Sequence, residues 1–120
     1  MTNLEIYTQA KLLVDNFNDL NQSLPVKINF FLQKNKNTIM ALAQGIDEAR
    51  LGILAKYGTL NQDTGSYDIP TENTAIVSSE LQDLFTIEQE VPIRKVSIDA
   101  FPDDIQLTTG QMEAMLFMID

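Results

Sequence analysis

The sequence predicts one domain of the α+β class that is predominantly helical, and three observations support this prediction. Apolar residues recur at alternating steps of three and four over the first 57 residues, which is typical of the buried face of long helices. Beyond residue 57 the apolar runs are shorter and turn residues separate them, as expected for short helices and a small β element. A chain of 120 residues is also large enough for one hydrophobic core. We therefore expect a single domain over residues 1–120, with a helical hairpin in 1–57 and an acidic α+β portion in 58–120.

The first helix is predicted to begin at Thr2 or Asn3, either of which can cap a helix N-terminus, and to end near Leu20. The loop of residues 21–23 that follows is short, so the next helix must fold back and pack antiparallel beside the first. The sequence thus predicts a helical hairpin. The apolar stripe of its first helix consists of Ile6, Ala10, Leu13, Phe17, Leu20 and Leu24.

The second helix is predicted to run from Pro25 to Tyr57, because proline is tolerated in a first helical turn and Gly58 can end a helix in the left-handed conformation. Its apolar residues follow a heptad pattern, and we call them the helix seam. Asn35 lies in this seam, where its amide either pins the register from a buried position or lies at the edge of the contact. The candidate seam residues are Leu32, Asn35, Ile39, Leu42, Ile46 and Ile53, with Ile28 and Ala49 in the same pattern.

The two predicted helices differ in length. At a rise of 1.5 Å per residue, a first helix of about 19 residues spans about 28 Å and a second of about 32 residues spans about 50 Å. The part of the long helix around residues 42–53 therefore needs another cover. We expect two shorter helices and a small sheet to supply it, or a second copy of the chain to pack on the exposed remainder.

A β-hairpin is predicted next, with Leu60 on one side of a turn at residues 61–65 and Tyr67 and Ile69 on the other. The acidic and amide residues of this turn invite comparison with the calcium-binding loop of an EF-hand. That loop requires glycine at its sixth position, which here is Ser66. A structural turn is therefore preferred over a calcium site.

Two further helices and one strand are predicted in the remainder of the chain. A helix should span Thr74–Phe85 and a strand Glu90–Ile98, and the plausible partner for that strand is the segment around Tyr67. Thr108 with Gln111 forms a capping box that begins the last helix. The inner face of that helix is predicted to consist of Met112, Met115, Leu116 and Ile119.

The net charge of −9 belongs to the second half of the chain. Residues 1–57 hold six basic and five acidic side chains, giving +1, whereas residues 58–120 hold two basic and twelve acidic ones, giving −10. Such acidity repels nucleic acid and membrane surfaces and attracts basic proteins, so we expect no direct nucleic-acid binding and no membrane binding. The acidic residues either keep the surface solvated or form a docking face, for which the candidates are Glu88, Glu90, Asp103 and Asp104.

Candidate catalytic groups are scarce. The chain has no cysteine and no histidine, which removes thiolate nucleophiles, the usual zinc ligands and the commonest general base. It also lacks the P-loop, G-x-G-x-x-G and G-x-S-x-G motifs. Adjacent carboxylates such as Asp47 and Glu48 are more typical of solvated charge than of a metal or glycosidase site. We therefore predict no enzymatic activity, no cofactor, and no catalytic, cofactor-binding or metal-binding residue.

Several short motifs follow one another along the chain. They are Leu24-Pro25-Val26, Ile46-Asp47-Glu48-Ala49-Arg50, Asp63-Thr64-Gly65, Ser79-Glu80-Leu81 and Glu90-Val91-Pro92-Ile93. Their arrangement resembles that of small uncharacterised proteins encoded by tailed-phage and prophage genomes. The resemblance covers most of the chain and implies a viral origin, with a location in the host cytoplasm or in the virion. It implies no activity and no site residue.

The sequence as a whole predicts a protein that functions by binding another protein. The first hypothesis is a minor structural or assembly protein that self-associates through the helix seam into a homo-oligomer. The alternative is a small acidic inhibitor of a host protein, for example one that handles nucleic acid or takes part in defence.

Overall fold

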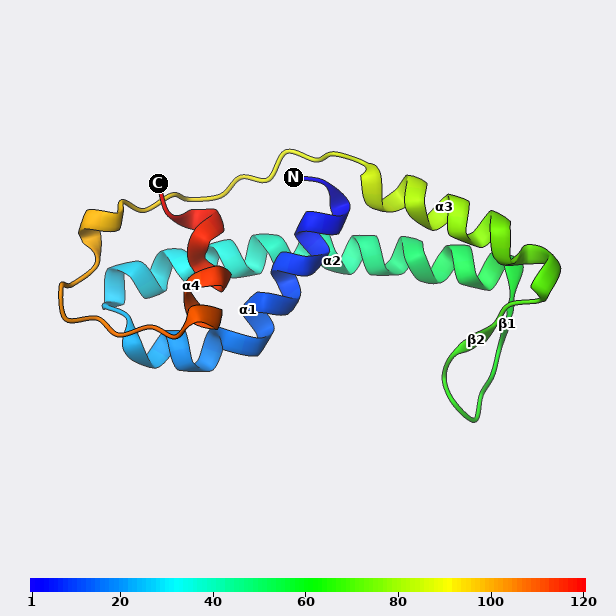
Figure 1. The fold of residues 1–120 in the computed structure, drawn as a ribbon, viewed down its shortest axis with the longest axis horizontal. Coiled ribbons are helices and arrows are strands. Elements are labelled where there is room, and N and C mark those ends of the chain that lie inside the picture. The colour runs from blue at the N-terminus through cyan, green and yellow to red at the C-terminus, as the bar shows by residue number, and fades with distance from the viewer.

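The computed structural model describes residues 1–120 and shows an elongated, mostly helical molecule of 56 × 31 × 21 Å (Figure 1). Its long axis follows α2, Val26–Tyr57. The helix α1, Asn3–Ser23, packs antiparallel on the first half of α2, and α3, Thr74–Thr86, packs on the second half. The helix α4, Thr109–Met115, packs on α1. The predicted class is confirmed: the fold is predominantly helical, with an N-terminal hairpin, a long second helix and one two-stranded β element.

The first helix begins with a capping box. The Thr2 hydroxyl accepts a hydrogen bond from the Glu5 backbone N–H at 3.1 Å, and the Glu5 carboxylate accepts one from the Thr2 N–H at 3.0 Å. The helix continues slightly beyond its predicted end to Ser23, and the Leu24 N–H still donates to the Leu20 carbonyl oxygen. Because two residues separate α1 from α2, the hairpin connection is tight.

The helix seam and the stripe of α1 form the hydrophobic core, although the seam does not follow the predicted heptad throughout. Leu42 and Ile53 are half-buried, and the inward position next to Leu42 belongs to Ala43. An α-helix has 3.6 residues per turn, so a strict seven-residue pattern drifts round a straight helix by about 20° per heptad. The seam therefore rotates away from α1 along the helix and reaches the side of α3 at Ile53. The seam residues that are buried are Ile28, Leu32, Asn35, Ile39 and Ile46.

A short β-hairpin follows α2, as predicted. Its strands β1, Thr59–Leu60, and β2, Tyr67–Asp68, pair antiparallel. Gly65 in the turn has a φ of 73°, a conformation that glycine adopts without steric cost. The left-handed ending predicted for α2 is wrong, because Gly58 is extended with a φ of −136°. Glycine is needed there for space, since a Cβ at Gly58 would lie 2.7 Å from the Asp68 carbonyl oxygen.

The helix α3 covers the distal half of α2 and spans nearly the residues predicted for it. A 3₁₀ turn at Thr71–Asn73 leads into it, and the Asn73 amide donates to the Tyr57 carbonyl oxygen at 2.9 Å. The Tyr57 hydroxyl in turn donates to the Glu80 carboxylate at 3.0 Å, and Val77 is the buried residue of α3. These contacts tie α3 to the end of the long helix.

Residues 87–96, which we call the strap, run back along α2 as extended chain outside any sheet (Figure 1). The predicted strand at Glu90–Ile98 and its pairing with the Tyr67 segment are therefore wrong, because β2 pairs with β1 alone. Pro92 has no N–H to donate, which disfavours a continuous ladder through the middle of the strap.

Separate hydrogen bonds hold the strap at its two ends. The Asn3 N–H donates to the Ile87 carbonyl oxygen at 2.8 Å, next to an isolated β-bridge between Thr2 and Glu88. At the other end, the Val96 N–H donates to the carbonyl oxygen of Met118, also at 2.8 Å. The strap thus joins the start of α1 to the C-terminal segment.

The helix α4 closes the core on the side of α1. Its predicted capping box is present, because the Thr108 hydroxyl accepts from the Gln111 N–H at 3.2 Å and the Gln111 side chain accepts from the Thr108 N–H at 2.9 Å. The predicted inner face is only partly correct: Met115 is buried, but Leu116 is 59% exposed. The chain tightens into a 3₁₀ turn at Leu116–Met118, which places Met118 in the core instead. The helix also does not cover the distal part of α2, where α3 packs.

Candidate functional site

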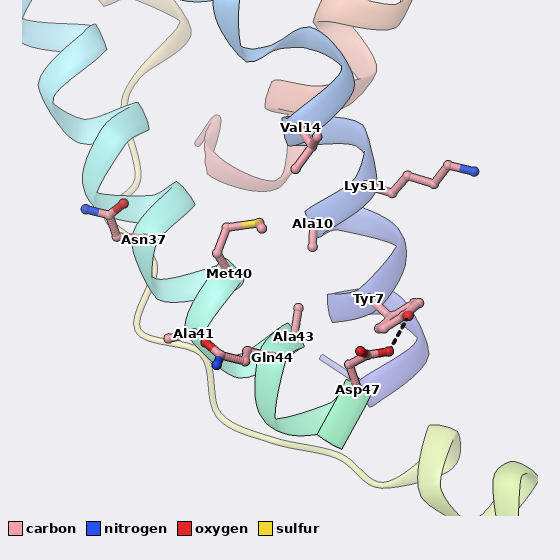
Figure 2. Close-up of a pocket in the computed structure, with 10 residues that line it drawn as sticks. All are labelled: Tyr7, Ala10, Lys11, Val14, Asn37, Met40, Ala41, Ala43, Gln44 and Asp47. Atoms are coloured by element: carbon pink, nitrogen blue, oxygen red, sulfur yellow. Dashed lines mark hydrogen bonds between the residues drawn. The ribbon is translucent and has the colours of Figure 1, made fainter. Parts of the chain in front are cut away.

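A groove of about 780 Å³ lies between α1 and α2 on the surface of the hairpin (Figure 2), and we call it the apolar groove. Val14 on α1 and Met40 on α2 face each other across it, and both side chains point into the space between the helices. Val14 is 57% exposed, so this wall presents apolar surface to solvent. The residues that line the groove are Tyr7, Ala10, Lys11, Val14, Asn37, Met40, Ala41, Ala43, Gln44 and Asp47.

Two alanines explain why the groove exists. Ala10 and Ala43 are nearly buried between the two helices and form its floor (Figure 2). A methyl group fills less of the space between two helix backbones than the larger residues that protein interiors use for close packing. Above this floor the side chains of α1 and α2 therefore do not meet, and a hollow remains.

A polar contact between the helices closes one end of the groove. The Tyr7 hydroxyl donates to the Asp47 carboxylate at 2.9 Å, and the Arg50 Nε donates to the same oxygen at 3.0 Å. The hydrogen bond from Tyr7, followed by that from Arg50, lowers the pKa of the Asp47 carboxyl, and the same bond raises the pKa of Tyr7. Asp47 is therefore held ionised at neutral pH, and its role here is to fix α1 against α2.

A second hollow of about 430 Å³ lies between α2 and the strap. We call it the cationic groove, because Lys34 and Arg94 are its charged lining residues and no carboxylate lines it. Asn37 lines both hollows, so the cationic groove and the apolar groove adjoin on the surface of α2. The other residues of the cationic groove are Phe31, Asn35, Thr38 and Pro92.

Asn35 fixes the strap at the cationic groove. The side chain is 1% exposed; its Nδ2 donates to the Arg94 carbonyl oxygen at 2.9 Å and its Oδ1 accepts from the Arg94 N–H at 2.8 Å. The two positions considered for this amide are thereby resolved in favour of burial. However, the amide hydrogen-bonds to the strap and does not pin the register of the hairpin.

The four acidic docking candidates do not lie on one face. Glu88 bridges to Thr2, just before α1 begins, whereas Asp104 lines a hollow with Ser23 at the end of α1. Since α1 has 21 residues, its two ends are about 30 Å apart. The predicted candidates therefore separate into two distant pairs, which are Glu88 with Glu90 and Asp103 with Asp104.

The helix seam is likewise no docking surface in this structure. Its buried residues contact α1, the strap and the C-terminal segment of the same chain. The remainder near Ile53 faces the hollow between α2 and α3. Self-association through this seam would require the chain to uncover its own core.

Neither groove was predicted from the sequence. A signal for the apolar groove was present, because Ala10 and Ala43 are small residues on the inward sides of two otherwise large-residue helices. No such signal exists for the cationic groove, since Lys34 and Arg94 lie on segments whose contact depends on the course of the strap.

The ionisable groups do not gather into a centre for metal chemistry. No three carboxylates come close enough together to share a metal ion. None of the helices combines the length and the apolar character needed to span a bilayer.

Comparisons with known proteins found no match: no family model, no curated protein and no solved structure is similar to this chain. The resemblance to phage and prophage proteins thus remains a prediction.

Proposed function

We propose that this chain is a non-enzymatic protein-binding module that holds an amphipathic helix of a protein partner in the apolar groove. The observation that supports this proposal is the groove itself, whose walls present the exposed Val14 and the half-buried Met40 while its floor is built from alanines. Small residues let another helix approach closely, and exposed apolar side chains supply surface to bury. Polar groups at its rim, such as Lys11 and Gln44, suit a partner helix that has one polar face.

The dimensions of the groove suit a helix of modest length. It extends along α2 from Asn37 to Asp47, and these ten steps correspond to about 15 Å of helix. A partner helix of about three turns would fill it, with apolar anchors spaced three and four residues apart. Such a module is compatible with both roles expected from the sequence, an assembly protein and an inhibitor.

The electrostatics favour a different protein as the partner over a second copy. Two copies that each carry a net charge of −9 repel one another. Most of the helix seam, which the sequence suggested for self-association, is already covered by the chain itself, and Leu42 and Ile53 are half-buried.

The test is a selection of amphipathic helical peptides from a displayed library on the purified protein. Peptides that bind the wild type should bind the Val14→Glu variant at least about tenfold more weakly, because burying a side chain of this size contributes about 1.5–3 kcal/mol and tenfold corresponds to 1.4 kcal/mol. Affinities are measured by fluorescence polarisation, and circular dichroism checks that the variant is folded.

The matched control is Leu116→Glu, which places the same charge on an apolar side chain of similar exposure outside the groove. Binding to this control should stay within about twofold of the wild type. Selected peptides that bind Val14→Glu as tightly as the wild type, or that lose as much affinity on the control, would disprove the proposal.

A further inference from the structure

Two cations without a carboxylate partner meet in the cationic groove. The chain has 17 acidic and 8 basic side chains, but ion pairs form at two places only, between Arg50 and Asp47 and between Lys56 and Glu80. Lys34 and Arg94 are among the cations that have no carboxylate partner, and they line the same hollow.

Both cations are positioned by their surroundings. The backbone of Arg94 is fixed by its two hydrogen bonds to Asn35, and its guanidinium carbon lies 5.1 Å from the centroid of the Phe31 ring. The Lys34 ammonium lies 5.5 Å from the centroid of Phe30. Contact with an aromatic face holds a cation in place while its N–H groups stay free to donate.

A third donor is Asn37. Its Oδ1 accepts a hydrogen bond from the Gln33 side chain at 2.9 Å, which leaves the Asn37 Nδ2 without a partner in the chain. Asn37 is also the residue shared by the two grooves. A helix that fills the apolar groove therefore passes beside the donors of the cationic groove.

We propose that the cationic groove binds a side-chain carboxylate of the same partner helix, held by Arg94, Lys34 and the Asn37 amide. The inference rests on the proposed function for the identity of the ligand, because the carboxylate is carried by the partner in the apolar groove. The affinity of the cationic groove for a carboxylate does not depend on the function proposed for the apolar groove. A guanidinium binds a carboxylate through two parallel hydrogen bonds, and charge-assisted bonds of this kind are the strong ones. The partner would thus combine apolar anchors with a glutamate or aspartate next to them.

The first experiment uses an acetylated triglutamate peptide as the probe, followed by NMR of the backbone amides. The signals of residues 34–38 and of Arg94 should shift, and the affinity should fall about fivefold or more in the double variant Lys34→Gln with Arg94→Gln. The matched control, Lys27→Gln with Lys56→Gln, makes the same change in net charge on cations that line neither groove and should retain the affinity. Equal losses in both double variants would overturn the proposal, since the attraction would then be general. Equal shifts with triglutamine would overturn it as well.

A second probe, inorganic phosphate, tests whether the cationic groove is specific for a carboxylate. The proposal expects phosphate to bind more weakly than triglutamate. Phosphate that binds as tightly would make the hollow a site for small oxyanions and would overturn the assignment to a partner side chain. These measurements need no partner helix, so they give their answer even when the test of the apolar groove fails.

The link between the grooves is tested with a helical peptide selected on the apolar groove. Changing its acidic residue to the amide should weaken binding to the wild type about fivefold and leave binding to the Lys34→Gln, Arg94→Gln variant unchanged, as expected for a direct pair in a double-mutant cycle. Independent losses in the two proteins would show that the carboxylate does not reach these cations.

Discussion

Asn35 offers the most informative single substitution in the fold. Its buried amide makes two hydrogen bonds to the backbone of Arg94, at 2.9 and 2.8 Å, and its Nδ2 also lies 3.6 Å from the sulfur of Met118. It therefore joins three parts of the molecule that are distant in sequence: α2, the strap and the C-terminal segment. We predict that removing this amide releases the strap.

The magnitude follows from the interactions that the amide makes. Each hydrogen bond contributes about 1 kcal/mol net, and the cavity left by the amide adds about 1 kcal/mol, so Asn35→Ala should lower the free energy of unfolding by about 3 kcal/mol. Asn35→Leu retains most of the packing volume and should cost about 2 kcal/mol, which is the hydrogen-bond part. The difference between the two variants separates packing from hydrogen bonding.

Two assays measure the effect. Urea denaturation followed by circular dichroism gives the free energy of unfolding, and hydrogen exchange by NMR follows the Arg94 amide, which should lose its protection in both variants. The control is Asn37→Ala on the exposed surface of the same helix, which should stay within about 0.5 kcal/mol. If both Asn35 variants also stay within that range and the Arg94 amide exchanges as in the wild type, the amide does not anchor the strap.

Other substitutions test the core, the pH response and the β-hairpin. Ile39→Ala, at a fully buried position, should lower the free energy of unfolding by about 2–5 kcal/mol in a urea titration, and Ile53→Ala should lower it clearly less. Equal losses in the two variants would contradict the rotation of the seam along α2. Hydrogen bonds from a tyrosine and an arginine lower the pKa of Asp47 below its ordinary 3.8. The ionised carboxylate therefore stabilises the fold above pH 3.8, and this stabilisation disappears as the pH falls through the lowered pKa. Asp47→Asn should therefore lose less stability than the wild type on acidification, and an unchanged acid limb would refute this. Gly58→Ala should destabilise the fold by about 1–3 kcal/mol, because the added Cβ would clash with the β-hairpin. Gly52→Ala should stabilise it by about 0.5–1 kcal/mol, because no atom lies within 4 Å of the added Cβ. A gain in stability at both positions in thermal melts would disprove the close approach at Gly58.

The sequence by itself determined the features that depend on neighbours in the chain. The capping boxes at Thr2 and Thr108 and the positive φ of Gly65 result from interactions between residues a few positions apart. The hairpin of α1 with α2 follows from the short connection between the two helices. The inward face of α2 also follows from local periodicity at most of its positions, and Ile39 and Ile46 are both buried. Between them the 3.6-residue turn places Ala43 inward in place of Leu42.

Tertiary structure alone decided the course of the strap and both grooves. The alternation of Val91 and Ile93 is the same for a strand and for an extended segment, and the difference lies in whether another strand is free to pair. Here β2 pairs with β1 alone, and the backbone of the strap is held by the side chain of Asn35, 59 positions away from Arg94. Contacts over such separations depend on how the whole chain folds back on itself. For that reason the presence of Lys34 and Arg94 in the same hollow could not be predicted from the sequence.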